Sequence, residues 1–195
     1  MHQSYCDAMS IVRKYGKPKY FLTMTANPAW PEVQAALRPG EQAHNRPDLI
    51  ARVFLLKLKA LLVDLLENHV LGVVIGYTWV IEFQKRGLPH VHMLSIVRAA
   101  DKPQTPEDID QRICAELPDL DDPAQAELLR VVLGGQVHGP CGSRNALAPC
   151  MNGKECIKKY PKDFQPVTLI NANGYPSYRR REESPTVMKG VHSVG

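Results

Sequence analysis

The sequence predicts an α+β fold in which helices lie on one side of a central antiparallel β-sheet. Two β-rich stretches, residues 73–84 and 90–97, are separated by the turn-forming segment 85–89, so they should pair as an antiparallel hairpin. A third β-rich run occupies residues 20–25, and an amphipathic helix follows Pro47. Helices, one strand and a hairpin in this order are typical of an α+β domain.

The elements of the first half are predicted by apolar spacing and turn residues. Residues 3–15 have apolar side chains at helical spacing, which predicts a helix. The β-rich run 20–25 ends at the turn-rich segment 27–31, and residues 34–46 should form a loop. The helix after Pro47 has one apolar stripe, which is the face it should bury. This stripe consists of Ile50, Phe54, Leu58, Leu61, Leu62 and Leu65.

Two further helices are signalled in the second half. Thr105 is a capping residue followed by proline and two acids, which predicts a helix start. Asp122 and Pro123 predict the start of another helix, which Gly134 should end. Residues 138–164 are rich in Cys, His and Lys without clear periodicity, so we expect a loop region there.

Length and composition limit the class of protein. The chain has 195 residues and 44% hydrophobic content, which suits one globular domain; we expect one domain over 1–195, truncated at both ends. No apolar run approaches the roughly 18 to 20 residues of a membrane span. The first residues lack the basic start and apolar run of a secretory signal, so we expect cytoplasmic synthesis and a nuclear location.

Charge is distributed unevenly along the chain. Residues 101–130 hold nine acidic and three basic residues, whereas residues 150–181 hold seven basic and two acidic ones. This separation suits a polyanion bound on one face with the acidic block turned away, and two solvated surfaces would explain it equally well. The candidate DNA contacts are Lys154, Lys158, Lys159, Lys162, Arg179, Arg180 and Arg181, and the candidate phosphate contacts are Lys85 and Arg86.

The pair His90 and His92 is the sharpest functional signal. Residues i and i+2 of a strand point to the same face, so both imidazoles can converge on one metal ion, although this spacing also arises by chance. Glu82 and Gln84 on the other arm of the hairpin share a face, and either can supply a third ligand. Two imidazoles and an oxygen ligand leave open positions for phosphate and suit Mg²⁺ or Mn²⁺ better than structural Zn²⁺.

A second cluster combines histidine and cysteine. The odd count of five cysteines argues against a disulfide framework. One imidazole and three thiolates in the pattern His-x₂-Cys-x₈-Cys-x₅-Cys form a feasible tetrahedral zinc set, and the alternative is three reduced cysteines packed in a loop. Cys6 and Cys114 occupy apolar helical positions and should lie in the core. The candidate zinc ligands are His138, Cys141, Cys150 and Cys156.

Several motifs resemble one known family. The stretch Ile81-Glu82-Phe83-Gln84-Lys85-Arg86-Gly87-Leu88-Pro89-His90-Val91-His92-Met93-Leu94 resembles the HUH motif of Helitron replication-initiator ("Helitron helicase-like") domains. Residues 21–32 resemble the motif that precedes it in that family. Shorter similarities extend over about residues 3–181. They are Asp7-Ala8-Met9, Arg46-Pro47-Asp48, His138-Gly139-Pro140-Cys141, Pro149-Cys150-Met151 and the segment from Gly174 to Arg181.

The resemblance implies an HUH endonuclease with a ferredoxin-like-derived fold, whose central antiparallel sheet presents two histidines. A divalent ion binds them with a nearby acidic or amide residue, and a tyrosine attacks single-stranded DNA at the transposon end, leaving a 5′-phosphotyrosine. In Helitrons this domain precedes a superfamily-1 helicase and drives rolling-circle transposition. The resemblance also implies that Thr25 and Asn27 line the site.

The sequence departs from the family at the nucleophile. The family's paired tyrosines follow the Tyr-Arg-Arg-Arg region, and none of the seven tyrosines here occupies that motif. The phosphate-binding loop of a helicase is also absent from the sequence. We therefore expect this chain to bind metal and single-stranded DNA without forming a phosphotyrosine alone. The alternatives are a catalytically incompetent DNA-binding remnant and a zinc-stabilised interaction module.

Overall fold

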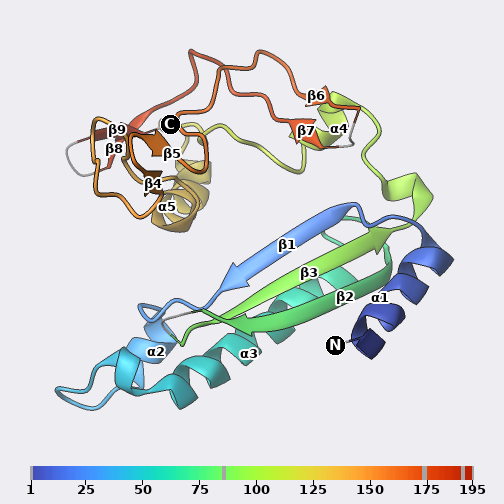
Figure 1. The fold of residues 1–195 in the computed structure, drawn as a ribbon, viewed down its shortest axis with the longest axis horizontal. Helices are drawn as coiled ribbons and strands as arrows, with labels where there is room; N and C mark the ends of the chain where they lie inside the picture. Colours follow the sequence, from blue (N-terminus) through green and yellow to red (C-terminus); the bar gives the residue numbers. More distant parts are fainter. Residues whose placement is uncertain (1, 85–86, 173–174, 190–191, 195) are drawn as a thin grey trace. The chain divides into compact units, whose positions relative to one another are not determined.

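A computed structural model describes residues 2–84, 87–172, 175–189 and 192–194 of the chain. The chain divides into two compact units, Met1–Lys102 and Pro103–Gly195 (Figure 1). The combination of helices with antiparallel strands confirms the α+β prediction. Within the described ranges, no helix combines the length and apolar character that crossing a membrane requires.

The first unit contains the elements that the sequence predicted most clearly. The helix at the N-terminus, the strand after it, the long helix opened by Pro47 and the hairpin are all confirmed. One short helix begins at Pro31, ahead of the predicted loop, because proline suits the first helical position. The elements are α1 (His2–Tyr15), β1 (Tyr20–Thr25), α2 (Pro31–Ala35), a 3₁₀ turn (Ala43–Asn45), α3 (Pro47–Leu66), β2 (Val74–Phe83), β3 (Pro89–Val97) and a second 3₁₀ turn (Ala99–Asp101).

The sheet of the first unit has the order β1-β3-β2, with β3 in the centre and antiparallel to both neighbours. The predicted hairpin is therefore correct, and β1 pairs with its second strand. Beyond the ladder the backbone N–H of Gln84 donates to the carbonyl of Leu88 at 3.0 Å, which closes the hairpin. Residues 85 and 86 of the predicted turn lie outside the described residues.

The two faces of the sheet have different environments because side chains alternate along each strand. Val91 and Met93 of β3 are buried in one hydrophobic cluster with Phe54 and Leu58 of α3, which runs along this face (Figure 1). The even-numbered residues of β3, starting at His90, point to the opposite face. The apolar stripe predicted for α3 is thus the surface that packs against the sheet.

Helix α1 packs against β2 and covers one end of the face that carries the histidines. A β-carbon at Gly76 would lie 3.1 Å from the ring of Tyr15 and 3.2 Å from Ile11, so only glycine allows this approach without displacement. Gly76 lies opposite Ile96, which is only 1% exposed. The helix therefore buries the far end of this face, whereas His90 and His92 at the other end stay partly exposed.

The second unit has short elements. Thr105 caps the start of α4 as predicted, and it does so in a capping box with Asp108. Asp122 caps a 3₁₀ turn rather than the α-helix itself, which follows it and ends at Gly135, one residue beyond the predicted end. The elements are α4 (Pro106–Asp110), the 3₁₀ turn (Pro123–Gln125), α5 (Ala126–Gly135), β4 (Met151–Asn152), β5 (Glu155–Cys156), β6 (Leu169–Ile170), β7 (Pro176–Ser177), β8 (Val187–Lys189) and β9 (His192–Val194).

One prediction about cysteines is wrong. Cys114 is exposed and lies beyond the end of α4 at Asp110, so it has no place on the apolar face of a helix. Its sulfur instead accepts a hydrogen bond from the backbone N–H of Glu116 at 3.4 Å. Cys6 does lie on a helix, α1, where it is half-buried rather than fully in the core.

Candidate metal centres

The first candidate centre is the histidine pair on the central strand of the sheet. The rings of His90 and His92 lie 4.4 Å apart between centroids, at an interplanar angle of 75°. The strand register places Thr25 and Glu82 directly opposite His90, one on each side. Strand alternation therefore brings the two imidazoles together as the His-x-His spacing predicts, with a hydroxyl and a carboxylate beside them.

Each imidazole has a partner on a neighbouring strand. The Nδ1 of His90 is 2.5 Å from the hydroxyl oxygen of Thr25, which leaves its Nε2 available. The Nε2 of His92 lies 3.4 Å from a carboxylate oxygen of Glu82. The ring of His92 also stacks on Phe21 of β1, with centroids 5.5 Å apart and planes 5° from parallel. These contacts fix both ring planes.

The two candidates for the third ligand differ in position. Glu82 is within the β2 ladder, and its carboxylate reaches His92. Gln84 lies beyond the end of β2, where it is exposed and its backbone closes the hairpin through Leu88 and Gly87. The geometry therefore favours Glu82. Asn27, also expected at the site, uses its side-chain oxygen to accept the backbone N–H of Ala29 at 2.9 Å.

The spacing between the His92 ring and the Glu82 carboxylate bears on whether the two could share one ion. The separation of 3.4 Å between His92 and Glu82 exceeds that of a strong charge-assisted hydrogen bond. It is a separation that two ligands of one ion can adopt when each is about 2.1 Å from it. The Nδ1 of His92 is buried and, among the described residues, has no hydrogen-bond partner, so its Nε2 is the nitrogen that faces the carboxylate.

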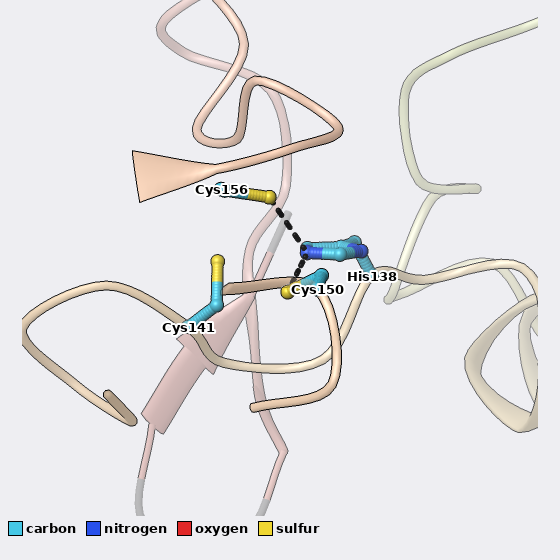
Figure 2. A group of neighbouring side chains, drawn as sticks. All are labelled: His138, Cys141, Cys150 and Cys156. Atoms are coloured by element: carbon cyan, nitrogen blue, oxygen red, sulfur yellow. Dashed lines mark hydrogen bonds between the residues drawn. The ribbon is translucent and has the colours of Figure 1, made fainter. Parts of the chain in front are cut away.

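The second candidate centre is the histidine–cysteine cluster of the second unit. Its four ligand atoms all lie within 4.8 Å of one another, and no other group of His, Cys, Asp or Glu in the described ranges gathers three or more ligand atoms so closely. The Nε2 of His138 is 3.4 Å from the sulfur of Cys150 and 3.7 Å from that of Cys156. Figure 2 shows these side chains and Cys141 turned toward one another. The chain brings together the residues that the spacing predicted, as a cluster that can bind a metal such as zinc.

The surroundings of this cluster shift the pKa values of His138, Cys141 and Cys156. Burial and the nearby Lys158 and Lys162 lower the pKa of His138, which favours the neutral imidazole that a metal requires. Burial and hydrogen bonds with the two neighbouring thiols raise the pKa of Cys141 to about 11. Burial also opposes ionisation of Cys156, but backbone N–H groups of Tyr160 and Lys158 lower its pKa overall.

The arginines of the basic segment are engaged within the second unit. The guanidinium of Arg181 donates two hydrogen bonds to Glu116, at 2.9 and 2.8 Å. Arg179 forms ion pairs with Asp110 at 3.2 Å and Glu116 at 3.4 Å. The expectation that the acidic block turns away from the basic one is therefore wrong for these two acids, because the fold pairs them with the arginines.

The lysines and Arg180 have different surroundings. Lys154, Lys158, Lys159 and Lys162 are exposed, as a polyanion contact requires. Lys162 lies over the ring of Tyr160 at 5.3 Å, and that ring stacks on His138 with centroids 4.0 Å apart. Arg180 lies over Phe164 at 5.7 Å. Lys85 and Arg86, the candidate phosphate contacts, lie outside the described residues.

Sequence reasoning missed the partners that fix these side chains. Phe21 was not singled out, although the alternation along β1 places it on the histidine face. The stacking of Tyr160 on His138 had no sequence signal, because the two rings are 22 positions apart in a region without a regular period. The two tryptophans differ in burial: Trp30 packs against the hydrophobic cluster, whereas Trp79 is 43% exposed.

The first unit is therefore an α+β module whose antiparallel sheet carries two imidazoles and a carboxylate on one face, as a candidate metal site. Residues 1–95 match the model of a family described as the Helitron helicase-like domain at the N-terminus. The match includes β1, α3, β2 and the part of β3 that carries both histidines, so this stretch of the chain is similar to that domain. No curated protein matches the chain.

Proposed function

We propose that the first unit is the metal-dependent, single-stranded-DNA-nicking module of a Helitron-type rolling-circle transposase, an HUH endonuclease. The observation that carries the proposal is the pair His90 and His92 on one face of the central strand, beside Glu82. The family match over residues 1–95 supports it independently. The assignment of a metal site depends on the two histidines and the carboxylate together, because one histidine on a strand, or one histidine beside a carboxylate, is not enough to hold an ion.

In this proposal His90, His92 and Glu82 hold one Mg²⁺ or Mn²⁺ ion. When bound, such an ion supplies Lewis-acid stabilisation of the charge that develops on a scissile phosphate. Thr25 holds the ring of His90 through Nδ1 and so directs its Nε2 toward the site. Phe21 holds the ring of His92 by stacking, which limits the movement of the second ligand.

The surroundings of the pair suit an unpaired strand of DNA. Phe21, Val80 and Leu94 share the histidine face by register and are 62%, 51% and 37% exposed. The aromatic ring of Phe21 suits stacking with a nucleobase, and metal-bound imidazoles suit a phosphate. In this proposal the bases contact the exposed apolar surface while a phosphate faces the imidazoles.

The tyrosines of the sheet do not fit the role of nucleophile. Tyr20 and Tyr77 both lie opposite Ser95 and therefore on the face away from the histidines. We propose that this chain supplies the metal and DNA sites, and that strand cleavage requires a tyrosine segment of the family's two-tyrosine type. A remnant that binds DNA without the reaction has the same geometry, so cleavage after addition of such a segment separates the two functions.

The direct test is Mn²⁺ binding to the full chain, measured by electron paramagnetic resonance. We expect one saturable site that His90→Ala or His92→Ala abolishes. His44→Ala is the matched control, because this exposed imidazole of the same unit belongs to the 3₁₀ turn Ala43–Asn45 and not to a strand, so its loss should leave binding unchanged. Mn²⁺ binding that survives both histidine substitutions would refute the proposed site.

A further inference from the structure

We propose that His138, Cys141, Cys150 and Cys156 bind one Zn²⁺ ion that maintains the fold of the second unit. This centre is separate from the histidine pair on β3 and does not rest on the proposed nicking function. Three thiolates and one imidazole are soft and borderline ligands that select zinc over Mg²⁺ or Mn²⁺. Four protein ligands complete a tetrahedral shell, which is the arrangement of a structural rather than a catalytic zinc.

The distances match one shared ion. Zn–S bonds of about 2.3 Å and Zn–N bonds of about 2.0 to 2.1 Å at tetrahedral angles separate a nitrogen and a sulfur ligand by roughly 3.6 Å. The Nε2 of His138 lies 3.4 Å from Cys150 and 3.7 Å from Cys156. All four ligand atoms fall within 4.8 Å of one another. An iron–sulfur cluster has several metal atoms between its thiolates and would hold them further apart.

The backbone presents the ligands from two separate turns. Cys150 directly precedes β4 and Cys156 ends β5 of the β4–β5 hairpin, in which Met151 pairs with Cys156 and the backbone N–H of Ile157 donates to the carbonyl of Cys150 at 2.9 Å. Gly153 at φ 61° provides the left-handed turn residue of this hairpin. His138 and Cys141 come from the loop after α5 (Figure 2).

The two turns contact each other near the cysteines. The backbone N–H of Gly142, next to Cys141, approaches the sulfur of Met151 at 3.1 Å. Met151 follows Cys150 directly, so this contact links the two ligand-bearing segments beside the cluster. The geometry thus brings both turns to one point, as a shared ion requires.

The segment has little else to stabilise it. Across residues 138–164 Ala148 is the one buried hydrophobic side chain among the described residues, whereas Leu147, Ile157 and Phe164 are 94%, 64% and 56% exposed. The strands there are two residues long. All five cysteines lie in described positions and each is a thiol rather than part of a disulfide. A bound ion is therefore the interaction that can offset the entropy of ordering this loop.

The test is metal content and cobalt spectroscopy of the full chain purified under reducing conditions. We expect one zinc per chain, and after exchange with Co²⁺ the intense thiolate-to-cobalt charge-transfer bands of a tetrahedral site. Cys150→Ser and Cys156→Ser should lose the zinc or weaken its binding strongly. Cys114→Ser is the matched control, because this exposed thiol of the same unit lies outside the cluster.

Two results would overturn the proposal. One is a wild-type chain that refolds with added Zn²⁺ yet retains less than half an equivalent after dialysis. The other is a Co²⁺ adduct without thiolate bands. If a cysteine variant fails to fold, the wild-type cobalt spectrum still decides the question. His90→Ala and His92→Ala should keep the full equivalent of zinc, so loss of the nicking site and loss of the zinc site give different results.

Discussion

The two candidate centres are built in opposite ways. In the first unit the ligands lie on the central strand of a sheet, and the described residues of this unit include twelve buried hydrophobic side chains; in the second they include only three, Ile109, Leu117 and Ala148. Strand pairing and the core fix His90 and His92 whether or not an ion is bound. The loops that carry His138 and the cysteines lack such support. In the first unit the fold positions the ligands without an ion, whereas in the second we propose that a bound ion stabilises the fold.

Removing zinc should therefore have the largest effect, and only in the second unit. Structural zinc contributes apparent binding free energies of about 10 to 16 kcal/mol in small zinc domains, which exceeds what three buried hydrophobic side chains supply. A strong chelator should make residues 138–164 sensitive to protease while residues 20–97 stay resistant. Limited proteolysis followed by mass spectrometry locates the cuts.

Re-addition of Zn²⁺, but not of Mg²⁺, should restore resistance in the zinc-free chain. This control separates loss of the ion from chelator binding or oxidation of the thiols. Cleavage of both units at equal rates would contradict the comparison, because the sheet of the first unit would then depend on the zinc as well.

A smaller effect concerns the ion pairs that join distant segments of the second unit. Hydrogen bonds from Arg181 lower the pKa of Glu116 to about 2 from the ordinary 4.5, and its side chain is only 5% exposed. A depressed carboxylate pKa stabilises the fold above pH 4.5, and this stabilisation is lost as the pH falls toward 2. Glu116→Gln should therefore cost about 3 kcal/mol at pH 7, measured by urea unfolding of the zinc-loaded chain.

The pH dependence provides the check. Acid also releases zinc from both proteins, so the difference between the wild-type and Glu116→Gln curves isolates the carboxylate. That difference should shrink steadily below pH 4.5. Glu127→Gln is the control, since both members of its pair with Arg130 are 72% exposed and such surface pairs contribute about 1 kcal/mol at most. Equal costs for the two substitutions would contradict the assigned role of Glu116.

The success of sequence reasoning differs between the units for a physical reason. Strand alternation is a local rule, so the sequence alone is enough to predict His90 and His92 on one face with Glu82 near them. The same rule did not decide whether Glu82 or Gln84 is the third ligand, because both fall on one face by alternation. Only the position at which β2 ends separates them, and that position depends on the closing turn. In the second unit, spacing identified the four candidate metal ligands, since a metal set is recognised by residue type rather than by backbone period.

Contacts between distant segments were beyond the sequence. Arg181 and Glu116 are 65 residues apart, and no local pattern indicates that they pair. The distribution of charge along the sequence therefore suggested separate acidic and basic surfaces, whereas the fold pairs two of the acidic residues with two arginines. Cys114 was misplaced for a related reason: apolar spacing continues past Asp110, but the helix ends there.

The smallest predicted effect tests how the first unit positions its ligands. Thr25→Val keeps the shape of the side chain and removes the hydroxyl that bonds Nδ1 of His90. Loss of a hydrogen bond that orients a metal ligand typically weakens metal binding by about 10- to 100-fold, so the Mn²⁺ dissociation constant should rise by that factor. Thr25 is exposed and valine suits a strand, so the free energy of unfolding should change little.

Thr23→Val is the matched control, because Thr23 lies on the same face of β1, opposite His92 rather than His90. It makes the same chemical change two register positions away, opposite His92, whose ring is already held by stacking on Phe21. Equal Mn²⁺ affinities of wild type, Thr25→Val and Thr23→Val would show that the Thr25 hydroxyl does not orient the ligand. A selective loss in Thr25→Val would show that β1, and not only the hairpin, forms part of the metal site.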